Sequence, residues 1–151
     1  YVYHKSGSGD TDSRTSDVER KLLCVLGATG GGRDRWKRPE MGRIAAAYCD
    51  HIILTNEDPY DENPEKIITE IKAGITESQS PVTSPQIVLD RRLAIRTALA
   101  LAQPRDTVVV TGKGSDPSIC GPRGAKEPWS DARVVEEEMA RLFGEKSENA
   151  P

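Results

Sequence analysis

Short apolar runs and longer amphipathic stretches alternate along the chain, four times in the same order. The apolar runs have four to six residues, mostly β-branched residues or leucine, which is typical of buried strands. The expected strands are Lys21–Leu26, His51–Thr55, Gln86–Leu89 and Thr107–Thr111. The expected helices are Pro39–Cys49, Pro64–Ile75, Arg91–Ala102 and Asp131–Phe143. This order predicts an α/β fold: a single Rossmann-like domain, with a mostly parallel sheet and helices on both faces.

Local signals mark the helix starts and the domain ends. Asn63-Pro64, Asp90 and Ser130 each stand just before an expected helix, where Asn, Asp and Ser side chains cap free backbone N–H groups. Residues 1–20 are polar and aperiodic, and 145–151 are polar, so we expect a flexible N-terminal linker and a flexible tail around a domain over 21–144. A Gly- and Pro-rich loop is expected over residues 112–128.

Composition narrows the function classes. Twenty-one basic and 24 acidic residues give a net charge of −3, which argues against a nucleic-acid partner. No apolar run approaches the roughly 20 residues of a membrane span and no signal-peptide pattern is present, so we expect a cytoplasmic protein with no membrane partner. Cys24, Cys49 and Cys120 show no C-x-x-C spacing, and we expect Cys24 and Cys49 to be buried free thiols. With two histidines only, we expect no metal site.

Three loops follow expected strands, at the sheet edge where α/β proteins bind ligands. The loop from Gly27 to Pro39 is glycine-rich and then basic, which suits either an anion site or an ordinary turn with a solvated face. Glu57–Glu70 carries six acids and one lysine, which suits either an amine site or a solvated, helix-capping turn. In the third loop, Gly112-Lys113-Gly114 can hold a carboxylate, but no Walker A loop occurs. Trp129 is expected to pack over the last helix rather than to stack on a ligand.

Five sequence blocks, taken together and in this order, carry a family resemblance. They are GGGRDRWKRPEMG (30–42), EDPYDENP (57–64), LDRRLAIRTAL (89–99), GKGSD (112–116) and PWSDARVV (128–135). Over about Lys21–Phe143 the chain resembles the C-terminal domain of Mur ligases. It is most similar to the UDP-N-acetylmuramoyl-tripeptide synthetases, which add the third, usually diamino, residue of the peptidoglycan stem peptide.

The resemblance implies a role in an ATP-dependent amide ligase. In the complete family enzyme, ATP with Mg²⁺ phosphorylates the peptide carboxylate and the amine of the incoming amino acid attacks the acyl phosphate. The UDP-sugar domain and the central ATPase domain that complete such an enzyme are not recognised in this chain. We therefore expect the chain alone to be inactive and to bind no cofactor tightly.

Carried over by position, the resemblance also implies site residues. Those expected to bind the incoming amino acid are Arg33 through its carboxylate, Glu57, Asp58, Pro59 and Tyr60 where the diaminopimelate enzymes have Asp-Asn-Pro-Arg, Gly112 through its backbone, and Asp116. Those expected on the nucleotide side are Lys37, Arg38 and His4.

The finer substrate expectation depends on Tyr60. Tyrosine cannot replace an arginine that pairs with a second carboxylate, and the acids Glu57, Asp58, Asp61 and Asp116 would favour a distal ammonium. We therefore expect a lysine-like diamino acid rather than meso-diaminopimelate. Two alternatives stay open: a stand-alone binding or interaction module without ligase activity, and a domain of a folylpolyglutamate- or cyanophycin-synthetase-like ligase.

Overall fold

The computed structural model of the chain describes residues 2–4, 20–32, 34–78 and 84–144. The strands are β1 (Val2–His4), β2 (Leu22–Leu26), β3 (His51–Leu54), β4 (Gln86–Ile87), β5 (Thr107–Val110), β6 (Ser118–Cys120) and β7 (Lys126–Pro128). The helices are α1 (Lys37–Tyr48), α2 (Pro64–Glu77), α3 (Arg91–Leu101) and α4 (Asp131–Phe143), with a 3₁₀ turn at Pro122–Gly124. Every element expected from the sequence is present, with its ends within two residues of the expectation. The caps are also confirmed, because Asn63, Asp90 and Ser130 accept hydrogen bonds from backbone N–H groups of α2, α3 and α4.

The main sheet has five strands in the order β1-β5-β2-β3-β4. Strands β5, β2, β3 and β4 run parallel to one another, which confirms the expected sheet. β1 pairs antiparallel with β5 at the edge of the sheet. β1 lies within the segment expected to be a flexible linker, so that expectation is wrong for residues 2–4. The chain runs outward from β2 to β3 and β4 and then returns to β5 on the other side of β2. The strand order therefore reverses between β2 and β5.

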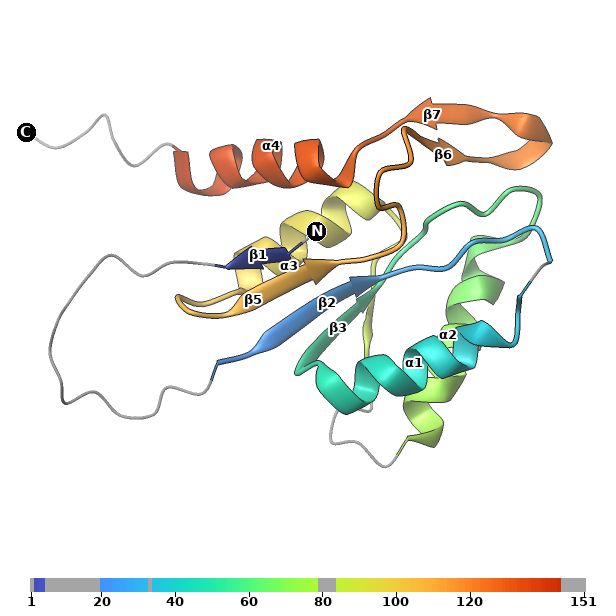
Figure 1. Cartoon of the computed structure of the whole chain (residues 1–151), viewed down its shortest axis with the longest axis horizontal. Helices are drawn as coiled ribbons and strands as arrows, with labels where there is room; N and C mark the ends of the chain where they lie inside the picture. The colour runs from blue at the N-terminus through green and yellow to red at the C-terminus, as the bar shows by residue number, and fades with distance from the viewer. Residues whose placement is uncertain (1, 5–19, 33, 79–83, 145–151) are drawn as a thin grey trace, which may run out of the picture.

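Two helices cover each face of the sheet (Figure 1). Side chains alternate along β2, so that Leu23 and Val25 pack with α3 and α4, whereas Cys24 and Leu26 pack with α1 and α2. Each face thus has its own buried apolar cluster, and the helix placement expected from the sequence is confirmed. No helix in the described part of the chain is long and apolar enough to cross a membrane.

Helices α1 and α2 approach until their backbones touch. A Cβ atom placed on Gly42 of α1 would lie 2.0 Å from the carbonyl oxygen of Ile71. One placed on Gly74 of α2 would lie 1.8 Å from the carbonyl oxygen of Pro39. The two glycines therefore permit a helix contact that any larger residue would prevent.

Cys24 and Cys49 form a disulfide, so the expectation of two free thiols is wrong. The crossover through α1 returns the chain beside β2, and this brings the two Cα atoms to 6.2 Å despite a sequence separation of 25. Their burial, which was expected, is confirmed. Cys120 in β6 is a free cysteine.

Removal of this disulfide is expected to lower stability. Closing a loop of this length removes entropy from the unfolded chain, worth on the order of 3 kcal/mol. The Cys24→Ser/Cys49→Ser variant should therefore unfold at a clearly lower temperature than wild type, whereas Cys120→Ser should not. Thiol titration of oxidised, denatured protein should find one reactive thiol per chain, and three would contradict the disulfide.

Candidate functional site

The three loops singled out in the sequence meet at the carboxyl ends of the strands, where the strand order reverses (Figure 1). They follow β2 (residues 27–32), β3 (residues 55–63) and β5 (residues 111–117). The β6–β7 hairpin continues from the third loop and lies over the same end of the sheet (Figure 1). In open α/β sheets, ligands bind at such a switch point.

The first two loops touch through Gly30. Its N–H donates to the carbonyl oxygen of Asp58 at 2.7 Å. A Cβ on Gly30 would lie 2.1 Å from the carbonyl oxygen of Pro59, so this approach requires glycine. Thr29 adds a side-chain contact, its Oγ1 donating to Glu57 Oε1 at 2.9 Å. The glycine-rich turn and the acidic turn thus form one continuous wall.

The third loop and the hairpin join this wall through Asp58. Lys113 Nζ is 2.6 Å from Asp58 Oδ2, and the ammonium-bearing side chain is only 1% exposed. The Cys120 N–H donates to Asp58 Oδ1 at 2.6 Å, and the Tyr60 N–H donates to the Cys120 carbonyl at 3.1 Å. Lys113 therefore does hold a carboxylate, as its Gly-Lys-Gly setting allows, but that carboxylate belongs to the chain itself.

Glu57 is buried at the centre of the three loops. Burial raises the pKa of its carboxyl, and the hydrogen bond from Thr29 acts in the opposite direction. Gly112 covers this carboxylate with a φ of +115°, and a Cβ there would lie 2.5 Å from Glu57 Oε2. Both the backbone conformation and the close approach favour glycine at this position.

A hollow of about 720 Å³ opens beside this wall, lined by Thr29, Gly30, Gly31, Asp34 and Tyr60. The Tyr60 residue is 40% exposed and holds a positive φ of +50°. Asp116 points outward from the third loop with its side chain 68% exposed, 3.7 Å from Lys113 Nζ. Of the expected amino-acid contacts, Tyr60, Gly112 and Asp116 are accessible, whereas Glu57, Asp58 and Pro59 are buried.

Arg38, which was expected on the nucleotide side, is bonded inside the domain. This guanidinium is 1% exposed and donates to Glu62, to Glu70 and to the Thr29 carbonyl. Its hydrogen bond to Thr29 stabilises the glycine-rich turn, and its charge is paired with the carboxylates of Glu62 and Glu70. Lys37 is exposed, and its ammonium pairs with Asp34 at 2.8 Å.

The Arg38–Glu62 pair should make stability depend on acid pH. Hydrogen bonding from Arg38 lowers the pKa of Glu62 to about 2. A carboxyl whose pKa falls on folding stabilises the protein above its unfolded pKa, near 4.3, and this stabilisation is lost as pH falls toward 2. Glu62→Gln should thus cost on the order of 2 kcal/mol at pH 7 and progressively less below pH 4. Chemical unfolding across pH 2–7 tests this, with Glu77→Gln as the surface control; an equal cost at every pH would contradict it.

Two other residues were expected at the site, His4 and Arg33. The backbone of His4 pairs with Thr107 at the start of β5, at the end of the strands opposite the loops, and its expected place beside the nucleotide stays a prediction. Arg33 lies outside the described residues. Within the described ranges, no group of three or more His, Cys, Asp or Glu side chains is placed to hold a metal ion.

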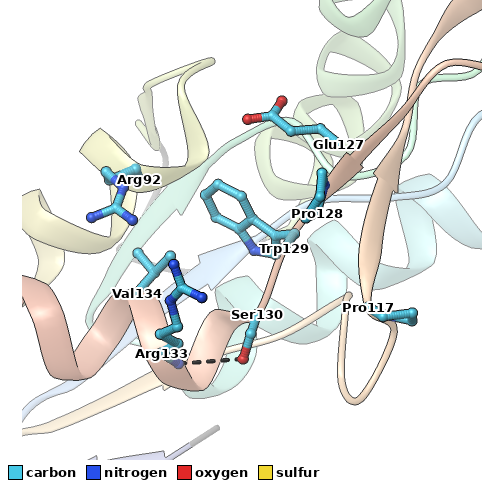
Figure 2. A pocket seen from close by; sticks show the side chains of 8 residues that line it. All are labelled: Arg92, Pro117, Glu127, Pro128, Trp129, Ser130, Arg133 and Val134. Atoms are coloured by element: carbon cyan, nitrogen blue, oxygen red, sulfur yellow. Dashed lines mark hydrogen bonds between the residues drawn. The ribbon is translucent and has the colours of Figure 1, made fainter.

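A second, smaller hollow of about 340 Å³ lies near the start of α4 (Figure 2). Trp129 lines this hollow and packs against the core, as expected. Its Nε1–H donates to Asp131 at 2.8 Å. The two arginines at this hollow, Arg92 and Arg133, both pair with Glu137. None of the expected site residues lines it, and its cations already have carboxylate partners.

Comparison with known proteins identifies the family. The family model described as "Mur ligase, glutamate ligase domain" matches residues 12–114. The chain therefore belongs to the Mur ligase family, through the domain that this model describes. The match begins within the polar segment before residue 20 and ends in the Gly-Lys-Gly loop.

Individual proteins similar to the chain support the same family assignment. The chain is 48% identical over 117 residues to the UDP-N-acetylmuramoyl-L-alanyl-D-glutamate–2,6-diaminopimelate ligase of Aquifex aeolicus, covering 78% of this chain and 23% of that protein. It is 45% identical over 120 residues to the ligase of the same name from Chlorobium phaeobacteroides, covering 80% and 22%. A solved structure of a ligase with this name aligns with a TM-score of 0.72 at 32% identity, covering 82% and 24%. The chain thus spans a little under a quarter of the length of these relatives.

Proposed function

We propose that the chain is the amino-acid-binding part of an ATP-dependent ligase that adds a diamino acid to UDP-N-acetylmuramoyl-dipeptide during peptidoglycan synthesis. The observation that carries this proposal is the hollow lined by the loops after β2 and β3, at the switch point of a Mur ligase domain. Both ATP and the nucleotide-linked peptide place this reaction in the cytoplasm.

The accessible groups suggest how the amino acid is held. Tyr60 and the turn Thr29–Gly31 line the hollow, and Gly112 and Asp116 are exposed on the third loop. Asp116, an exposed carboxylate, suits an ammonium group of the ligand. Arg33 remains the partner that the sequence predicts for the α-carboxylate.

Two of the residues expected on the nucleotide side have carboxylate partners within the chain. Arg38 is used internally, Lys37 is paired, and no phosphate-binding loop occurs in the sequence. We therefore assign ATP and Mg²⁺ to the remainder of a complete ligase. This chain's contribution is to bind the amino acid and to present its amine.

Among the diamino acids, we propose a lysine-like substrate. The proposal now depends mainly on Tyr60, because the structure weakens the argument from the neighbouring acids. Asp58 pairs with Lys113 and burial raises the pKa of Glu57, so these two acids add less free negative charge than their number suggests. Tyr60 still supplies a neutral hydroxyl where a second carboxylate would need a cation. The relatives named above are 2,6-diaminopimelate ligases, and their substrate is the competing possibility.

Competition between amino acids tests this proposal. The chain would replace the matching segment of the Aquifex aeolicus ligase, with the unmodified ligase as control. Offered equal lysine, ornithine and meso-diaminopimelate, the graft should favour lysine or ornithine by roughly tenfold, because an unpaired buried carboxylate costs about 1–3 kcal/mol. Preference for meso-diaminopimelate would overturn the lysine-like substrate. A graft that forms no amide, with the control active, would favour a stand-alone binding module. The isolated chain should release no phosphate from ATP above a boiled control.

A further inference from the structure

Asp58 uses all three of its oxygen atoms to bind parts of the chain. Its Oδ2 pairs with Lys113, its Oδ1 accepts from the Cys120 N–H, and its carbonyl accepts from the Gly30 N–H. These partners belong to the loop after β5, the β6–β7 hairpin and the loop after β2. One buried residue on the loop after β3 therefore connects this loop to the loop after β2, the loop after β5 and the hairpin.

We propose that Asp58 is a positioning residue that holds the walls of the amino-acid hollow, and that it does not contact the amino acid. The inference rests on the proposed function for the identity of the ligand. Both members of the Asp58–Lys113 pair are buried, and a buried pair is strongly disrupted when one partner is removed. The pair is thus suited to fixing a geometry and unsuited to opening for a ligand.

Tyr60 links this tether to the hollow. Its N–H donates to the carbonyl of Cys120, the residue whose own N–H is held by Asp58, and its ring lines the hollow. Loss of the Asp58 carboxylate would release the hairpin and, with it, Tyr60. It would also leave the Lys113 ammonium with Asp116, at 3.7 Å, as a remaining partner, and so would occupy the carboxylate expected to receive the ligand amine.

Amide hydrogen exchange on the free chain tests the tether. Asp58→Ala should speed exchange at the Cys120 and Tyr60 amides by roughly tenfold, since the Cys120 N–H loses its buried acceptor. Asp58→Asn keeps an oxygen for the Cys120 N–H but removes the charge opposite Lys113, so it should restore only part of the protection. Glu138→Ala is the matched control, because Glu138 is also a buried carboxylate but pairs with Arg92 and Arg96 between α3 and α4. Equal exchange in Asp58→Ala and Glu138→Ala would overturn the proposal.

Lysine titration of the same variants separates positioning from direct contact. Affinity should fall with amide protection in Asp58→Ala and recover with it in Asp58→Asn. Lost affinity with unchanged exchange, or an Asp58→Asn variant with restored protection but no restored affinity, would show a ligand contact and overturn the proposal. So would lost protection with unchanged affinity.

Two further outcomes are decisive. If wild type binds no diamino acid, the proposed function fails, while the exchange data still decide whether Asp58 is the tether. If Asp58→Ala does not fold, Lys113→Met removes the other half of the pair and keeps a long side chain. Faster exchange at Cys120 is expected in that variant, and unchanged exchange there would equally overturn the proposal.

Discussion

Gly74→Ala is expected to destabilise the chain by on the order of 3 kcal/mol or more, beyond the usual range for an overpacked core position. The added Cβ would lie 1.8 Å from the Pro39 carbonyl oxygen and 2.6 Å from its carbon, so α1 and α2 must separate. Both atoms are backbone, and no side-chain rotation relieves the contact. Separation would loosen Ile71 and Ile75, which are fully buried in the cluster beneath the two helices.

This result would oppose the intrinsic preference of a helix for alanine over glycine, which is worth about 1 kcal/mol. Gly144→Ala is the matched control, because nothing lies within 4 Å of a Cβ there and φ is −75°. We expect that control to stay within about 0.5 kcal/mol of wild type. Denaturant unfolding measures both variants, and a Gly74→Ala variant as stable as Gly144→Ala would show that the helices do not touch here.

Gly30→Ala is expected to abolish most amino-acid-dependent activity of the grafted ligase, with a fall in kcat/KM of roughly a hundredfold. Its φ is not positive, so the penalty of alanine in the left-handed region does not apply at this position. The effect comes from the Pro59 backbone, whose oxygen and carbon would lie 2.1 and 2.7 Å from the new Cβ. The two loops must part, and the hydrogen bond from Gly30 to Asp58 is lost with the wall that it closes.

Gly32→Ala separates this contact from a general effect on the loop. Gly32 has a φ of +77°, so alanine costs about 1–2 kcal/mol of local strain there, but its Cβ would meet nothing within 4 Å. Activity should therefore fall much less than in Gly30→Ala. Similar activities in the two variants would mean that the contact between Gly30 and Pro59 does not build the site.

The parts of the fold that depend on near neighbours in sequence could be predicted. Alternation along Leu23–Leu26 specifies which side chains face each helical layer, and the caps at Asn63, Asp90 and Ser130 act within three residues. β1 could not be predicted, because its partner β5 begins more than a hundred residues later. The β6–β7 hairpin was also missed, since its strands have three residues each and contain few β-branched side chains.

The candidate site, like the fold, has parts that the sequence predicts and parts that it does not. The position of the three loops follows from the strand order, and therefore from the sequence pattern. The sequence does not tell which charges are satisfied internally, because Asp58 and Lys113 lie 55 residues apart and Arg38 and Glu62 lie 24 apart. An acidic turn has the same composition whether it is solvated or paired, and Thr29 gave no signal at all.

We propose that the three loops form a binding site for a diamino acid. The most direct test of this site is an amide NMR titration of the chain with lysine and with meso-diaminopimelate, with glycine as the control. We predict saturable shifts at Thr29–Gly31, Tyr60 and Gly112–Asp116, and none around Trp129 in the second hollow. Shifts confined to that second hollow, or no saturable shift with either diamino acid, would contradict the claim.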